Sequence, residues 1–195
     1  MGIRTFIAID LENEETLENI QSFTNRLQMN QPKMKVVKPE NIHLTVKFLG
    51  NIKESLAPKI YEILETKVNQ KLLQGEKYIY KLNHVGQFRK YSIIWLGMEG
   101  DIDFLQNIKD TIEESLNQRL NLKKDKRRKF KPHITIARLK KKRIDYKTFD
   151  SFKNIIETHR NENFGDFIVD KVKLKKSDLT PKGPIYTDYT KEGFK

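Results

Sequence analysis

The sequence predicts an α+β fold built from two similar lobes that share one core. The pattern His-apolar-Thr-apolar occurs twice, at 43–46 and at 133–136, in a chain that has only four histidines. Each copy follows an apolar strand-like run and a helical segment, and each precedes another helical segment, which indicates one internal duplication. The length of 195 residues suits one compact unit. We therefore interpret 1–195 as a single domain of two lobes, with one motif strand in each.

The first lobe is predicted to begin with an apolar strand at 5–9 and a helix that Asn13 caps. A brief extended piece at 36–37 precedes the first motif strand, which we expect to run over 43–49 and to stop at Gly50. A second helix follows, with Pro58 in its first turn, where proline is tolerated. The helices are assigned from apolar residues at helical spacing, namely Leu17, Ile20, Phe23 and Leu27 in the first and Leu56, Ile60, Ile63, Leu64 and Val68 in the second.

The second lobe is predicted to open with strands at 78–82 and 92–96. A third helix leads through a basic connection at 119–131 into the second motif strand, at 133–137. After a fourth helix, the tail holds a strand or bulged strand at 167–174, a turn at 181–184 and a last strand at 185–189. The apolar residues that predict the two helices are Ile102, Leu105, Ile108, Ile112 and Leu116 in the third and Phe149, Phe152, Ile155 and Ile156 in the fourth.

The composition favours a cytoplasmic protein with a polyanionic partner. Charged residues make up 33% of the chain and the net charge is +12, which favours nucleic acid or an anionic surface, although a lysine-rich surface is often only solvated. The absence of cysteine excludes disulfides and thiolate chemistry. The N-terminal apolar run is too short for a signal peptide, and no window approaches the ~20 apolar residues of a membrane span. We expect a cytoplasmic monomer without membrane contact.

The repeated motif carries the chemistry. Because alternate residues of a strand point to opposite faces, His43 and Thr45 share one face while Leu44 and Val46 lie on the buried face. In the second copy, His133 and Thr135 likewise share one face, opposite to that of the apolar residues. The two strands would then line one polar cleft. One imidazole can act as general base while its protonated partner acts as general acid, and the hydroxyls can donate hydrogen bonds to an oxyanion. This set suits phosphoryl chemistry without a metal.

Other interpretations of the motif fit less well. A single His-x-Thr would most simply be a structural histidine, but two equivalent copies favour a site. A two-histidine metal site needs further ligands, and no cluster of His, Asp or Glu with ligand spacing adjoins either copy. There is no Gly-x-Ser-x-Gly elbow for a serine hydrolase and no glycine-rich phosphate loop followed by Lys-Ser/Thr.

The segments HLTVKFLG at 43–50 and PHITIAR at 132–138 resemble the two signature motifs of the 2H phosphoesterase superfamily. More narrowly, the chain resembles the RNA 2′,3′-cyclic phosphodiesterases, historically called 2′-5′ RNA ligases. The segments RTFIAID at 4–10, IWLG at 94–97 and SDLTPKGPIY at 177–186 are also similar to that group. The resemblance thus extends over nearly the whole chain.

The resemblance implies a bilobal fold with two antiparallel sheets, flanked by helices, around a central cleft. It implies hydrolysis of a 2′,3′-cyclic phosphate on RNA 3′ ends or nucleotides to a 2′-phosphate, with no metal and no cofactor. By position, His43 corresponds to the proton donor, His133 to the proton acceptor, and Thr45 and Thr135 to the residues that hold the phosphate. The alternatives are 2′-5′ RNA ligation, hydrolysis of small cyclic nucleotides, or a non-catalytic RNA-binding module on the same fold.

Three residues next to the motifs are placed by strand alternation. Arg138 matches the arginine that ends the second motif and would bind phosphate, but strand alternation places it on the face of Ile136, away from His133. Alternation also places Phe48 in the core. It puts Lys47 on the His43 face, near phosphate or simply solvated.

Several other residues are candidates for binding or for packing. The basic segments at 123–129 and 140–143 would steer RNA, or they are solvated loops. Tyr186, Tyr189 and Phe88 would stack on a base or pack within the protein. Of the remaining histidines, His159 is expected to pack within the fourth helix, and His84 lies in a loop-like stretch without a role.

Overall fold

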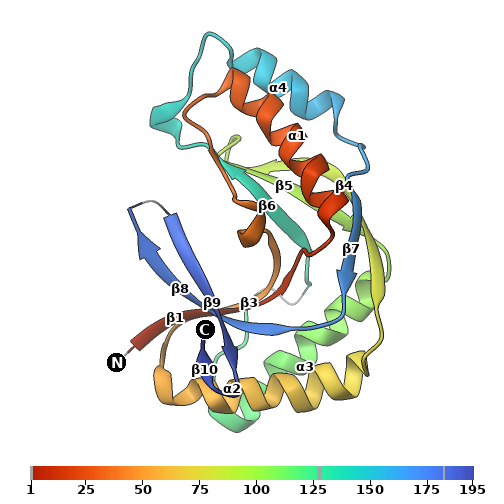
Figure 1. Cartoon of the computed structure of the whole chain (residues 1–195), viewed down its shortest axis with the longest axis vertical. Coiled ribbons are helices and arrows are strands. Elements are labelled where there is room, and N and C mark those ends of the chain that lie inside the picture. Colours follow the sequence, from red (N-terminus) through yellow and green to blue (C-terminus); the bar gives the residue numbers. More distant parts are fainter. Residues whose placement is uncertain (1, 127–128, 182) are drawn as a thin grey trace.

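A computed structural model describes residues 2–126, 129–181 and 183–195. Within these ranges ten strands form one antiparallel sheet in the order β10-β9-β8-β1-β3-β6-β5-β4-β7, with β2 also paired to β6 (Figure 1). The strands are β1 (Gly2–Asp10), β2 (Lys35–Val36), β3 (His43–Lys53), β4 (Tyr78–Phe88), β5 (Ile93–Glu99), β6 (His133–Arg138), β7 (Gly165–Val169), β8 (Lys173–Thr180), β9 (Gly183–Thr190) and β10 (Gly193–Phe194). The longer helical elements are α1 (Glu14–Asn30), α2 (Ala57–Ile63), its π-helical continuation η3 (Leu64–Leu73), α3 (Ile102–Leu120) and α4 (Phe149–Thr158).

The expected α+β fold is confirmed, but its two sheets are continuous. They are joined where β3 and β6 meet, through one residue pair, Leu44 with Ile134. One half of the sheet holds β1, β3 and the C-terminal strands, and the other holds β4, β5, β6 and β7. The two motif strands are therefore direct neighbours at the centre of the sheet.

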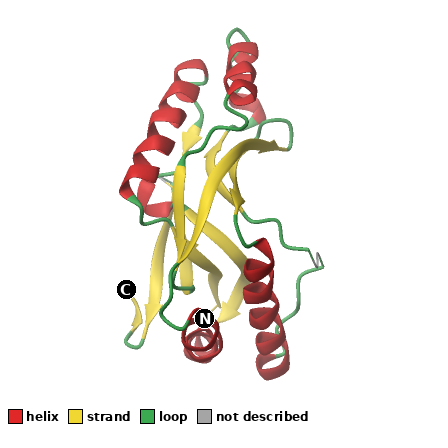
Figure 2. Ribbon diagram, turned by 90° about the vertical axis from the view of Figure 1, so that its right-hand side faces the viewer, coloured by secondary structure: helices red, strands yellow, loops and turns green. Residues whose placement is uncertain are grey.

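Helices α1 and α3 each pack away from the half of the sheet that holds the strands next to them in the chain. Helix α1 precedes β3 in the chain, yet it packs with α4 and β7 on the other half, whereas α3 packs with α2 and η3 (Figures 1 and 2). Asn13 caps α1 as expected, by accepting a hydrogen bond from the backbone N–H of Thr16 at 3.0 Å. The Thr16 hydroxyl donates to the carbonyl of Asp166 at 3.0 Å. Gly165, at φ +121°, makes this contact possible, because a Cβ there would lie 2.3 Å from the Thr16 hydroxyl.

Three predicted elements differ from the structure. Strand β3 does not stop at Gly50, because glycine adopts φ +70° at a bulge and pairing resumes beyond it. The single strand predicted at 167–174 is wrong, because it comprises β7 and the start of β8, which pair with different strands. The stretch around His84 is not a loop, since β4 continues through a bulge at that residue, where φ is +61°. The other predicted strands and helices are present, and Lys182 of the predicted turn lies outside the described residues.

The buried apolar side chains form one cluster that includes residues from both halves, among them Ile7, Leu44, Ile94 and Ile134. Leu44 and Ile134 belong to the two motif strands, and Ile7 and Ile94 belong to the strands beside them, β1 and β5. No helix in the described ranges is both long and apolar enough to span a membrane.

Candidate functional site

The two motif histidines are held in the same way. Nδ1 of His43 lies 2.8 Å from the carbonyl oxygen of Asn41, and Nδ1 of His133 lies 2.9 Å from that of Lys131. A carbonyl oxygen can only accept, so each Nδ1 carries the proton and each neutral ring presents Nε2 as the reactive nitrogen. Backbone carbonyls thus fix ring orientation and tautomer together.

The pairing of β3 with β6 brings the four predicted motif residues together. Leu44 is opposite Ile134, and both are fully buried on the other face of the sheet. Extending this antiparallel register by one residue on each side puts His43 across from Thr135 and Thr45 across from His133. Two histidines and two hydroxyls therefore share one face around a local two-fold axis.

Both motif strands contain a bulge at the same position. On β3, Thr45 pairs with Ala8 and Lys47 with Ile7, so Val46 has no opposite residue. On β6, Thr135 pairs with Trp95 and Ala137 with Ile94, so Ile136 has none. An unpaired extra residue reverses the alternation of side chains beyond it. The sequence offered no sign of either bulge.

The bulges reverse three sequence predictions. Arg138 lies beyond Ala137, which is buried, and so projects on the face of His133 rather than that of Ile136. Phe48 is not in the core, because its side chain is 69% exposed on the His43 face. Lys47 neither faces phosphate nor is solvated, because it is buried on the opposite face.

Lys47 instead belongs to a largely buried charge cluster. Its Nζ lies 2.9 Å from Glu113 Oε1 and 2.8 Å from Asp125 Oδ1. Lys109 contacts the same two carboxylates, and the backbone N–H of Asp125 donates to Glu113 at 3.1 Å. Two cations thus balance two anions, and the cluster ties β3 and α3 to the basic connection that leads to His133. Arg127 and Arg128 of that connection lie outside the described residues.

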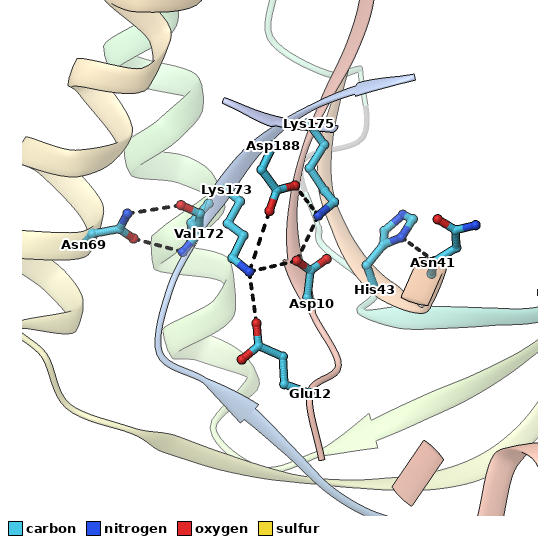
Figure 3. A network of polar contacts seen from close by, with 9 residues as sticks. All are labelled: Asp10, Glu12, Asn41, His43, Asn69, Val172, Lys173, Lys175 and Asp188. Carbon is cyan, nitrogen blue, oxygen red and sulfur yellow. Dashed lines mark hydrogen bonds and ion pairs between the residues drawn. The ribbon is translucent and has the colours of Figure 1, made fainter. Parts of the chain in front are cut away.

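A second network flanks His43 (Figure 3). Asp10 is the neighbour of His43 on β1 and accepts from Lys175 at 2.8 Å and from Lys173 at 2.9 Å. Lys175 also contacts Asp188 at 2.5 Å and is nearly buried. The sequence did not single out this network, because its members come together only when β1 pairs with β8 and β8 with β9.

The surroundings of His43 act on its protonation. Burial lowers the pKa of His43 below its ordinary value of 6.5. The carbonyl of Asn41 and the carboxylate of Asp10 oppose that shift, whereas the positive charges of Lys175 and Arg138 add to it. The neutral form of His43 is therefore favoured when no anion is bound.

Aromatic rings surround both histidines. Phe6 and Tyr186 pack against His43 with ring centroids at 5.0 and 5.4 Å. Phe88 and Trp95 contact His133 at 5.2 and 6.1 Å. Burial raises the pKa of Tyr186, while the charges of Arg138, Arg4 and Lys175 oppose the shift. Of the three predicted stacking candidates, Tyr186 and Phe88 thus lie beside the histidines.

The remaining candidates lie away from this face. Tyr189 packs on Tyr61 and Phe194. His159 packs on Phe23 and contacts an Arg26 nitrogen at 2.9 Å, as expected of a structural residue. Among the described residues, no group of three or more His, Asp or Glu side chains is placed to hold a metal ion.

Known proteins have sequences similar to this chain over nearly its whole length. Two relatives named RNA 2′,3′-cyclic phosphodiesterase, from Methanocaldococcus jannaschii and Thermotoga maritima, are 36% and 34% identical. The alignments cover 94% of this chain in both cases and 96% and 91% of the relatives.

Solved structures agree on the fold. The crystal structure of E. coli LigT complexed with 3′-AMP has a TM-score of 0.66 at 21% identity, covering 97% of this chain and 95% of that one. A crystal structure described as a phosphoesterase has a TM-score of 0.71 at 23% identity, covering 97% of each chain. The family model described as the AKAP7 2′5′ RNA ligase-like domain matches residues 5–189. The chain belongs to this family of 2H phosphoesterases, as the paired motifs indicated.

Proposed function

We propose that this protein hydrolyses RNA 2′,3′-cyclic phosphate ends to 2′-phosphomonoesters by general acid and base catalysis with His43 and His133. The observation that carries the proposal is the symmetry of the two rings, each fixed through Nδ1 by a backbone carbonyl with Nε2 left for the substrate. The names of the relatives that cover nearly the whole chain support the same activity.

In the proposed reaction the cyclic phosphate lies between the two histidines, with Thr45, Thr135 and Arg138 donating hydrogen bonds to its oxygens. His133 takes a proton from water, whose oxygen bonds to phosphorus as the bond to O3′ breaks. His43 gives its Nε2 proton to O3′, which leaves the phosphate on O2′. Solvent then exchanges the protons back.

The donor role of His43 depends on the substrate. Its pKa is lowered in the free protein, mainly by burial, so the ring is poorly protonated near neutral pH. A bound phosphate adds a negative charge that opposes the effects of Lys175 and Arg138 and thereby raises the pKa of His43. The acid would therefore be formed in the complex rather than before binding.

Incubation with RNA that ends in a 2′,3′-cyclic phosphate, with EDTA present, tests the proposal. We expect loss of the cyclic end, a 2′-phosphate product and no effect of the chelator. His43→Ala and His133→Ala should each lower turnover at least about 100-fold while circular dichroism and thermal unfolding stay close to those of the unmodified protein. Full turnover in either variant, or a 3′-phosphate product, contradicts the mechanism. Formation of longer RNA would point to ligation instead.

A further inference from the structure

A cavity of about 720 Å³ adjoins the second motif on the side away from His43. Its wall includes Trp95 and Gly97 of β5, which are opposite Thr135 and His133 and so lie on the face of the motif residues. Pro132 and Lys131, which directly precede His133, line it as well. The size is within the range of pockets that bind small organic groups. The cavity thus lies beside the second motif, since its lining includes residues opposite and directly before His133.

The sequence keeps one wall of this cavity aromatic. Gly86 on β4 leaves room for the Trp95 ring, because a Cβ at this position would come within 2.2 Å of it. Gly97 has His84 Cβ and the Trp95 ring at 3.3 and 3.5 Å from the position of its missing Cβ. Gly86 therefore lets the indole lie close against β4, whereas a Cβ at Gly97 would only touch the ring. Phe130 contributes a second ring to the lining.

The lining of the cavity carries a net positive charge, because three cationic side chains accompany one carboxylate, that of Glu157. Lys129, Lys131 and Arg160 line it, and among the described residues neither lysine forms an ion pair. Arg160 has Glu157 at 3.6 Å, in a pair whose side chains are more than half exposed and which is therefore weak. A cyclic mononucleotide has one phosphate, which the proposed reaction holds between His43 and His133. These cations would then lack an anion unless the substrate carries a further phosphodiester.

We propose that the cavity binds the nucleotide that precedes the terminal one in RNA, with its base against Trp95 and its phosphodiester near Lys129 and Arg160. Aromatic surfaces with nearby cations are the common means of binding single-stranded RNA. The inference rests on the proposed function. It deepens that function, because it makes an RNA end of two or more nucleotides, rather than a free cyclic nucleotide, the preferred substrate.

Kinetics with matched substrates test the inference. We expect a trinucleotide with a 2′,3′-cyclic end to have a kcat/KM at least about tenfold above that of the cyclic mononucleotide with the same terminal base. The double variant Lys129→Ala/Arg160→Ala should raise KM about tenfold for the trinucleotide and leave the mononucleotide unchanged. The slope of log KM for the trinucleotide against log salt concentration should decrease by about 0.7, because the two cations contact one phosphodiester.

The control variant, Lys59→Ala/Lys71→Ala, removes the same charge from exposed positions on α2 and η3. It should change neither substrate's KM. An equal loss on both substrates in the cavity variant, or no loss on either, overturns the inference.

Fluorescence gives a second readout that needs no turnover. Trp95 is the only tryptophan of the chain and lines the cavity beside His133, so its emission reports on ligands bound at this end of the site. In the His43→Ala variant, we expect the trinucleotide to quench the emission at concentrations at least about tenfold below those needed for the mononucleotide. Equal quenching by both ligands, or none by the trinucleotide, contradicts the inference. Quenching by the trinucleotide in an unmodified protein that hydrolyses neither substrate would instead contradict the proposed function.

Discussion

Arg138 and Phe48 occupy the same position in the two motif strands, each just beyond a bulge and each turned to the face of the histidines. The two motif strands thus place a guanidinium on one side of the site and an exposed aromatic ring on the other. The local two-fold axis relates the histidines and threonines but not the charge. We expect this asymmetry to orient the substrate, because the anionic phosphate is attracted toward β6.

Arg138→Ala should lower kcat/KM for a cyclic-phosphate RNA end by about 10- to 150-fold, since hydrogen bonds to charged groups contribute about 1.5–3 kcal/mol. Arg138→Lys should recover only part of the activity, because a lysine cannot form the bidentate contact. Steady-state kinetics measures both. The control is Arg119→Ala, which removes an exposed arginine at the end of α3. Equal kinetics for Arg138→Ala and the control would mean that Arg138 does not reach the phosphate.

Thr45→Val and Thr135→Val should each lower kcat by about 100-fold, because each removes one hydrogen bond to the oxygens that gain charge in the transition state. Valine keeps the size and the branching of threonine, so the strands should remain intact. Thr45→Ser and Thr135→Ser restore the hydroxyl and should retain most of the activity. Serine variants as poor as the valine variants would assign the threonines a packing role only.

The proposed acid and base can be separated with a diester whose leaving group is a nitrophenolate. Such a leaving group departs without protonation, so His43→Ala should retain activity toward it while losing activity toward RNA ends. His133→Ala should lose both activities, because water must still be deprotonated. Release of nitrophenolate, followed by absorbance, gives the measurement. The opposite pattern would exchange the roles of the two histidines.

Lys47→Met should destabilise the protein by about 3–5 kcal/mol, because it leaves Glu113 and Asp125 with one cation instead of two in a largely buried cluster. Combining it with Glu113→Gln rebalances the charges and should recover part of the loss. Urea unfolding, monitored by circular dichroism, gives both values. Equal stability of Lys47→Met and the unmodified protein would show that the cluster does not stabilise the fold.

The protonation of His43 should appear in the pH dependence of stability. Its folded pKa is lowered from 6.5, so between the two values the unfolded chain binds more protons than the folded one. His43 therefore contributes stability above pH 6.5 that is lost as the pH falls toward the lowered pKa. Comparing the free energy of unfolding at pH 7.5 and 5.0, we expect a smaller decrease for His43→Gln. An identical decrease in both proteins would contradict the direction of the shift.

The sequence predicted the motif residues because a repeated His-x-Thr is visible without any knowledge of strand pairing. The strand faces predicted for Lys47, Phe48 and Arg138 were wrong for one reason. Alternation predicts the faces of a regular strand, whereas the bulges at Val46 and Ile136 are set by the register against β1 and β5. Such registers depend on residues far away in the chain.

Long-range strand pairing also explains why two other features were not predicted from the sequence. The apolar stretch at 167–174 gives no sign that the chain crosses from one half of the sheet to the other between β7 and β8. Asn69 marks this crossing, because its side chain binds both the N–H and the carbonyl of Val172 (Figure 3). The Asp10 and Lys175 pair depends on the same crossing, so its place beside His43 could not be predicted locally.

Because each half of the sheet is covered by a helix from the other half of the chain, the site can form only when both halves are present. A cut in the turn between β4 and β5 would give an N-terminal piece that holds His43 without α3 and a C-terminal piece that holds His133 without α1. Each piece would expose the apolar surface that a helix from the other normally covers, so neither should fold by itself. The pieces can regain structure only by complementation. Folding of the intact protein must therefore wait for contacts between distant segments.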